Sequence, residues 1–317
     1  MTTTPAKTGA AKTIPAGSPA IPASAWWLAA LPPLFFSGNF LLARAMRDAI
    51  PPFQMSFWRW AVALAILLPF CLPAIRAQWP RIRANLPFLA LLGGIGVTAF
   101  NCFVYAALHH TTVVNAALVN SLLPIATFLL AFLILKQRLA PRQILGIAVS
   151  LAGAAVVIAR GDLAALRSFS PNPGDLLVLG GMSFWALYTV LIRWRPLGLE
   201  PIALLGITVG FGVLFHLPLV AWEYRNLGGF TLDAASAGTI LYLAIFPSIL
   251  AYIFWNRSVA VLGPGRTGMF MHLLPIFSAV LATLFLGERL ALYHALGFAL
   301  VVVGILIVTR PPAAKSA

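Results

Sequence analysis

Long apolar runs separated by short polar breaks make up almost the whole chain from Trp26 onward. Each run holds roughly twenty residues, the length that an α-helix needs to cross a hydrocarbon core about 30 Å thick. Because lipid offers no hydrogen-bond partners, a spanning helix must satisfy its own backbone. The pattern predicts an all-α integral membrane protein with ten transmembrane helices, at residues 25–46, 52–72, 86–108, 113–135, 142–159, 174–192, 201–222, 238–260, 267–286 and 292–309.

The second half of the chain repeats the first at an offset of 151 residues. The run Leu-Leu-Pro-Ile at 122–125 recurs at 273–276, and about fifteen of the roughly 37 positions aligned from this run onward are identical. Gly146 falls on Gly297, and Gly153 falls on Gly304. Five helices per half is an odd number, so the second half must be inverted in the membrane relative to the first. The sequence therefore predicts an inverted 5+5 structural repeat.

Loop composition predicts the boundaries and the orientation. Residues 1–24, rich in Thr, Pro, Ala and Gly, are expected to form a disordered tail. The first repeat is predicted at 25–160, a linker at 161–173, the second repeat at 174–310 and a second tail at 311–317. With the N-terminus inside, thirteen Lys and Arg residues fall on that side and six on the other. Because cytoplasmic loops carry the excess of Lys and Arg, we expect a multi-pass inner-membrane protein with both termini in the cytoplasm.

The composition excludes several classes of protein. Hydrophobic residues make up 61% of the chain and charged residues only 9%, whereas a soluble domain carries about 25% charged residues. The net charge of +14 is spread singly or in pairs between apolar runs, so no nucleic-acid partner is expected. Neither a phosphate-binding glycine loop nor a metal-spaced cluster of His or Cys occurs in the sequence, and no pair of acids suits hydrolysis. We expect no enzyme activity, no cofactor and no metal.

Polar and aromatic residues inside the apolar runs are the candidates for a substrate site, because an unpartnered polar group in hydrocarbon is costly. Pairs at i and i+3 or i+4 share one face of a helix. An aromatic and amide-lined cavity would suit a zwitterion with an apolar side chain, since amides orient its charged ends and rings cover the rest. For each Asn the alternative is a hydrogen bond between helices with no ligand. The candidates are Asn39, Asn101, Tyr105, Asn120, Trp185, Tyr188, Tyr252, Trp255 and His272.

Two prolines at equivalent repeat positions are the candidates for gating. Pro124 and Pro275 cannot donate a backbone hydrogen bond, so helices four and nine are expected to bend at matching depths. The alternative is that proline is simply common in membrane helices. The glycines seven residues apart in helices five and ten predict close packing of these two helices as a fixed scaffold.

The acidic residues bear on coupling to protons. All seven fall at predicted helix ends or in loops, namely Asp48, Asp162, Asp175, Glu200, Glu223, Asp233 and Glu288. A carboxylate-driven proton antiporter would lack its central residue. We therefore expect uncoupled exchange or coupling through His272, which lies one turn before Pro275.

The repeat resembles a known transporter family. The break at 286–290, Leu-Gly-Glu-Arg-Leu, followed by Gly297 and Gly304, is similar to the EamA repeat of the drug/metabolite transporter superfamily, and Arg59 lies where that pattern often carries an arginine. The first copy departs from the pattern, with Lys-Gln-Arg at 136–138. The resemblance implies a secondary carrier, commonly an exporter of amino acids or other small metabolites, with aromatic amino acids among the substrates of some members.

Two alternatives stay open at this point. One is a flippase of a lipid-linked substrate, and the other is a membrane scaffold that transports nothing. An intramembrane enzyme would need catalytic residues that the sequence does not offer. The partners expected are a small-molecule substrate and the lipid bilayer. The sequence leaves the oligomeric state open and is compatible with a monomer.

Overall fold

The structure is a computed structural model that describes residues 23–111, 116, 119–162, 172–286 and 291–309. Every regular element in these ranges is helical. The structure does not describe residues 1–22 of the predicted N-terminal tail, the predicted C-terminal tail or residues 163–171 of the predicted linker. Glu288 also lies outside the described residues.

Nine helical stretches in the described ranges are long and apolar enough to cross a membrane. The remaining predicted span, 113–135, is represented by α7 (Leu123–Leu135), which follows a turn at residues 121–122. The spans are α1 (Ala23–Ala45), α2 (Pro52–Ala77), α4, η1 and α5 (Leu86–Gly93, Gly94–Ala99, Phe100–His110), α8 (Pro141–Ile158), α10 (Pro173–Trp194), α11 (Pro201–Leu227), α12, η2 and α13 (Ala234–Leu243, Ala244–Leu250, Ala251–Leu262), α14, η3 and α15 (Pro264–Met269, Phe270–Leu273, Leu274–Leu286), and α16 (Leu292–Thr309). The all-helical membrane fold is confirmed.

Two helices run well past their predicted C-terminal ends, and one helix was not predicted. α2 continues past Pro73 to Ala77, although the predicted span stops at residue 72. Proline is tolerated there because neighbouring helices can satisfy the freed carbonyl in a membrane bundle. α11 continues past residue 222, so Glu223 lies inside a helix rather than after one. The short helix α3 (Trp79–Arg83) connects α2 to α4.

The repeat seen in the sequence is also present in the geometry. Shifting α7 by 151 residues gives the bounds of α15, and shifting α8 gives those of α16. The π-helical segments η1 and η2 likewise interrupt equivalent spans at equivalent depths. A π-helical turn inside an α-helix is uncommon and often marks a functional region. Both halves therefore carry the same irregularity in their third span.

α8 and α16 pack antiparallel through their glycines. A β-carbon built on Gly146 would lie 2.8 Å from the carbonyl oxygen of Gly304, and one on Gly153 would lie 2.7 Å from that of Gly297. Each contact pairs the early glycine of one helix with the late glycine of the other, which is the pattern of a two-fold axis. Because two equivalent helices can run antiparallel only if their parent halves point in opposite directions, the repeat is inverted.

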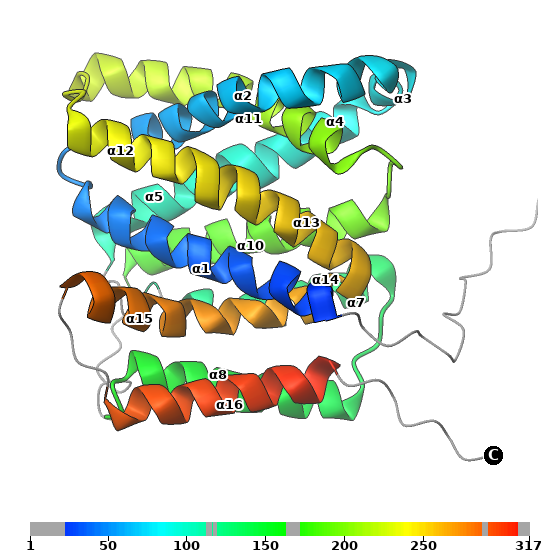
Figure 1. The fold of residues 1–317 in the computed structure, drawn as a ribbon, viewed down its shortest axis with the longest axis vertical. Coiled ribbons are helices and arrows are strands. Elements are labelled where there is room, and N and C mark those ends of the chain that lie inside the picture. Colours follow the sequence, from blue (N-terminus) through cyan, green and yellow to red (C-terminus); the bar gives the residue numbers. More distant parts are fainter. Residues whose placement is uncertain (1–22, 112–115, 117–118, 163–171, 287–290, 310–317) are drawn as a thin grey trace, which may run out of the picture.

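α2 and α11 form a second antiparallel pair of equivalent helices. Gln54 at the start of α2 donates through Nε2 to the carbonyl of Gly228, 2.7 Å away, just after α11. At the other end, the backbone of Glu200 donates to Oε1 of Gln78 at 3.0 Å. Figure 1 shows this pair at one edge of the bundle and the α8–α16 pair at the opposite edge, with the other spans between them. The start of α1 and the end of α16 lie at the same end of the bundle (Figure 1).

The glycine contacts give a stability prediction. Gly304→Ala places a methyl group against the Gly146 carbonyl, 2.6 Å from it if nothing moves, and we expect overpacking to cost about 1–3 kcal/mol. The matched variant is Gly238→Ala in α12, where a β-carbon meets nothing within 4 Å, so helix propensity should keep or raise its stability. Thermal unfolding of the purified protein in detergent measures both. Equal melting temperatures for the two variants would contradict the close backbone contact.

Candidate functional site

Four of the predicted site residues form one aromatic cluster in the middle of the bundle. Trp185 lies at its centre, with ring centroids 5.4 Å from Tyr188, 5.0 Å from Tyr252 and 5.2 Å from Trp255. All four side chains are buried, and Trp60 adds a fifth ring 5.0 Å from that of Tyr252. Stacked, edge-on and tilted ring pairs at these distances are all favourable contacts. The rings therefore pack on one another through these contacts.

The glycine-bearing π-helical segment η1 brings this cluster against the backbone. The Tyr252 hydroxyl donates to the carbonyl oxygen of Gly96, and a β-carbon on Gly96 would lie 2.8 Å from Cγ of Tyr188 and closer still to Cδ2 of the same ring. Only glycine allows a ring to approach that closely without a shift of the chain. The predicted residue Asn101 lies just beyond η1 and donates to the carbonyl of Val97 at 2.7 Å.

Two more predicted residues, Asn39 and Tyr105, hold a buried arginine. Nη1 of Arg59 donates to Oδ1 of Asn39 at 2.9 Å and to the Tyr105 hydroxyl at 2.5 Å. Nε of Arg59 donates to Oγ of Ser248 at 2.9 Å. The guanidinium also lies 5.0 Å from the ring centroid of Trp60. The side chain is 1% exposed, so the network joins α1, α2, α5 and η2 around one cation.

Arg59 has no acidic partner among the described residues. The ion pair found in those ranges is the exposed one between Arg47 and Asp48. A cation deep in a membrane bundle is costly, and such residues ordinarily pair with an anion or face a water-filled path. Neutral hydrogen-bond acceptors and aromatic faces lower this cost but do not cancel the charge.

A hydrogen bond from a tyrosine hydroxyl to an asparagine amide occurs in both halves, but the buried arginine occurs only in the first. The Tyr105 hydroxyl donates to Oδ1 of Asn39 at 2.7 Å, and the Tyr188 hydroxyl donates to Oδ1 of Asn256 at 3.0 Å. Asn256 is the repeat equivalent of Tyr105, so each bond ties the third span of a half to its first span. The repeat equivalent of Arg59 is Gly210. The positive charge is therefore a feature of the first half alone.

Three buried polar side chains near the centre lack hydrogen-bond partners within the described part of the chain. They are the amide of Asn120, which is 1% exposed, and the indole nitrogens of Trp60 and Trp185. Buried polar groups in folded proteins are almost always partnered, so each exception asks for an explanation. A ligand that supplies the missing partners is one such explanation.

His272 lies where the two broken helices meet. Its Nε2 is 2.9 Å from the carbonyl oxygen of Ser121, and its Nδ1 is 2.5 Å from Oγ of Ser150. A carbonyl only accepts, so Nε2 carries a proton, while the Ser150 hydroxyl can donate to a neutral ring or accept from a charged one. Ser121 and His272 are repeat equivalents. A contact between a residue and its own equivalent places both close to the pseudo-two-fold axis.

The two prolines begin helices rather than bend them. Pro124 is the second residue of α7 and Pro275 the second residue of α15. A turn at 121–122 precedes α7, and the 3₁₀ segment η3 precedes α15. Proline suits the first turn of a helix, where its missing donor has no partner to lose. The chain is thus broken at equivalent depths in both halves, one turn before each proline.

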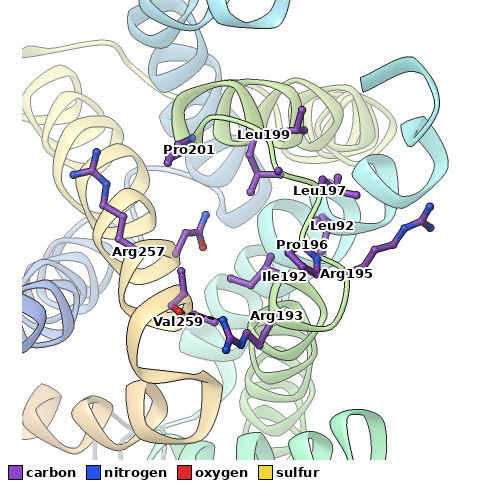
Figure 2. A pocket seen from close by; sticks show the side chains of 14 residues that line it. Leu92, Ile192, Arg193, Arg195, Pro196, Leu197, Leu199, Pro201, Arg257 and Val259 are labelled. Atoms are coloured by element: carbon purple, nitrogen blue, oxygen red, sulfur yellow. Dashed lines mark hydrogen bonds between the residues drawn. The ribbon is translucent and has the colours of Figure 1, made fainter. Parts of the chain in front are cut away.

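A cavity opens at the end of the bundle that carries the loop between α10 and α11. It has a volume of about 260 Å³. Figure 2 shows Arg193 extending from α10 toward Val259, whereas Arg195 and Arg257 extend away from the middle of the cavity. Its walls are Leu92, Ile192, Arg193, Arg195, Pro196, Leu197, Gly198, Leu199, Pro201, Leu204, Asn256, Arg257, Val259 and Ala260. Asn256 connects it to the aromatic cluster through the bond to Tyr188.

Sequence reasoning missed two buried residues of this region. His216 of α11 is 2.7 Å from Oγ of Ser56 through Nε2 and 2.8 Å from the carbonyl of Gly212 through Nδ1. Glu223 accepts from the backbone nitrogens of Phe53 at 3.1 Å and Gln54 at 2.7 Å, and so caps α2 from a neighbouring helix. The sequence pattern puts Glu223 at a helix end, where a solvated carboxylate is expected. Only the position of α2 shows that it is buried.

Comparison with known proteins gives consistent matches. The model of the EamA-like transporter family matches residues 23–159 and again residues 172–310. The uncharacterized transporter YyaM of Bacillus subtilis is 28% identical over 86% of this chain and 89% of its own. A protein of Streptantibioticus cattleyicolor, described as a probable terminal-alkyne amino-acid exporter, is 27% identical over 90% of this chain and 93% of its own. One crystal structure, at 21% identity and a TM-score of 0.73, covers 90% of this chain and 97% of that one.

Proposed function

The chain belongs to the EamA-like transporter family of the drug/metabolite transporter superfamily, and on this premise we propose that it exports or exchanges amino acids across the inner membrane. The family and the apolar helices make it a multi-pass membrane transporter. In the proposed scheme the central region opens to alternate sides of the bilayer, and no catalysis occurs. One chain supplies every residue of the scheme, so a monomer suffices.

The observation that carries this proposal is the uncompensated charge of Arg59. A buried guanidinium without an acidic partner is stabilised when a carboxylate arrives, because Nη2, which makes none of the bonds above, can then donate a charge-assisted hydrogen bond to it. Asn39, Tyr105 and Ser248 hold the guanidinium in one place before the substrate binds. The unpartnered indole nitrogen of Trp60, next to it, offers one more donor to the same carboxylate.

The aromatic cluster supports a substrate with an apolar or aromatic side chain. Trp185, Tyr188, Tyr252 and Trp255 offer ring faces beside the arginine, and a substrate ring can replace the contacts they make with each other. The free indole nitrogen of Trp185 and the amide of Asn120 remain for the polar end of the substrate. The amino-acid exporter among the relatives, although only 27% identical, favours the same class. Aromatic amino acids fit this arrangement best.

The broken helices support a gating role for their prolines. α8 and α16 are held together by backbone contacts, so movement is more easily placed in α7 and α15, each of which is hinged one turn before its proline. His272 joins the two hinges and can change its charge without losing either contact. In the proposed scheme it is the group through which protons could be coupled to transport.

Arg59 gives a prediction about substrate charge. In liposomes loaded with a panel of amino acids and their decarboxylated amines, the protein should exchange the acids and discriminate against the amines. Arg59→Gln should lower exchange of the acids about 10- to 100-fold, since hydrogen bonds to a charged group contribute about 1.5–3 kcal/mol. Arg76→Gln on the same helix, whose side chain is exposed, is the control. If Arg59→Gln keeps the preference for acids, this arginine does not bind the carboxylate.

Trp185 gives a prediction about the aromatic side chain of the substrate. Trp185→Ala should reduce exchange of aromatic amino acids at least about tenfold, because it removes a ring face and an indole donor together. Trp222→Ala, at a residue 56% exposed on α11, should leave exchange unchanged. Size-exclusion profiles report the amount of folded protein for each variant. Undiminished exchange by folded Trp185→Ala would remove the aromatic cluster from the transport path.

Orientation can be tested along a single helix. Glu200 and Asn226 lie at opposite ends of α11, and both are exposed, whereas the natural Cys71 and Cys102 are buried. A membrane-impermeant maleimide should label Asn226→Cys in intact cells and Glu200→Cys only after the cells are opened. The reverse labelling would place both termini outside and leave the family assignment untouched.

A further inference from the structure

The cavity at the end of the bundle that carries the α10–α11 loop is lined by Arg257, which the proposed transport scheme does not use. Arg257 is exposed on α13, about one and a half turns before the helix ends at Leu262. Val261, which is 53% exposed, and Ala260 lie on the same side. An apolar exposed face of a transmembrane helix contacts lipid, so Arg257 lies at the level where side chains reach the headgroups.

The charged residues that line this cavity are all basic. Arg193, Arg195 and Arg257 line it, and no acidic residue does. Arg193 donates through Nη1 to the carbonyl of Ala260 at 3.1 Å, and Arg195 donates through Nη2 to Oδ1 of Asn85 at 2.8 Å. Arg257 has no hydrogen-bond partner in the described ranges. The rim therefore attracts an anion, and Arg257 has its full set of donors available.

The size and walls of the cavity point to a lipid rather than a soluble substrate. Its volume of about 260 Å³ is below the range of about 300–1,000 Å³ that encloses most small-molecule ligands. The cavity can therefore hold only part of a ligand, such as the first part of an acyl chain whose remainder lies in the bilayer. Leu92, Ile192, Leu204 and Val259 make its inner walls apolar. A soluble anion would be met by guanidiniums that point inward, but those of Arg195 and Arg257 point away from the middle (Figure 2).

The neighbouring residues agree with this depth in the membrane. Trp194 ends α10 directly beside Arg193 and Arg195 and is 52% exposed. Tryptophan is enriched where the hydrocarbon meets the headgroups. Basic residues between helices at this level are typical of sites for anionic lipid headgroups.

We propose that this cavity binds one anionic phospholipid, with its phosphate on Arg257 and the first part of an acyl chain between α10, α11 and α13. The chain then lies against Asn256, which is bonded to Tyr188 of the aromatic cluster. A bound lipid would therefore support the wall of the central region from outside. The proposal does not depend on which solute the protein carries.

Lipid retention by the whole purified protein tests this inference. Native mass spectrometry should show phosphatidylglycerol retained in preference to phosphatidylcholine of the same chain lengths. Arg257→Gln should lower the bound fraction of phosphatidylglycerol about fivefold, the effect of about one basic residue at a membrane surface. Arg225→Gln, an exposed arginine at the opposite end of α11, should leave it unchanged.

A second pair of variants tests the cavity without changing charge. Ala260 is exposed and lines the cavity, so Ala260→Phe should fill the mouth and reduce retention. Val261→Phe on the adjacent, non-lining position should not. Equal retention of the two lipids, or equal effects of Arg257→Gln and Arg225→Gln, would overturn the proposal. Displacement of the lipid by an equal concentration of glycerol 3-phosphate would show a soluble-phosphate site instead, and would overturn it too.

Discussion

The structure depends on the direct contact of two helix backbones across a pseudo-two-fold axis. No hydrophobic effect draws helices together in lipid, so close packing of backbones and buried hydrogen bonds must hold the bundle. The reciprocal glycine contacts of α8 and α16 provide that packing, and each glycine meets a carbonyl of the other helix. The axis they define also passes near Ser121 and His272, where the two broken helices touch. The glycine-packed helix pair and the two helix breaks thus share one symmetry element.

Several buried polar residues differ between the two halves and so break this symmetry. Gly146, Gly153 and the prolines keep their identity across the repeat, whereas Arg59 is matched by Gly210, Asn120 by Met271, and Ser150 by Val301. Positions that pack backbones are constrained in both halves by the same contact. Positions that meet a solute are not, because an asymmetric molecule bound between two halves presents a different group to each. Of these unmatched residues, Asn120 has no hydrogen-bond partner and Arg59 has no acidic partner among the described residues, whereas Ser150 is bonded to His272.

The sequence was sufficient for the helices and for the inverted repeat, because length, hydropathy and an odd number of spans leave few alternatives. It was not sufficient for the neighbours of each polar side chain. Tyr105 and Asn39 were predicted as site residues, but only the packing of α2 between them shows that they bind Arg59. Glu223 was assigned to a helix end because no local pattern shows that the N-terminus of α2 covers it. The aromatic residues were expected to line a cavity, yet helical spacing does not show whether rings face a ligand or one another.

In the proposed scheme, the packed aromatic cluster and the uncompensated charge of Arg59 next to it give a reason why a substrate would be needed for movement. The rings of Trp185 and its neighbours contact one another, so a solute that enters between them must separate them and lose their mutual contacts. Apolar surface on the solute can replace those contacts. Its contribution to the free energy of binding is, however, about the same in any conformation that surrounds the solute with rings. The carboxylate differs, because it removes the uncompensated charge of Arg59. An ammonium group on the same solute can lie over an aromatic face, where a cation is also stabilised. On the proposed scheme, a zwitterion neutralises the arginine without leaving an excess charge of its own, which neither an amine nor an uncharged ring can do.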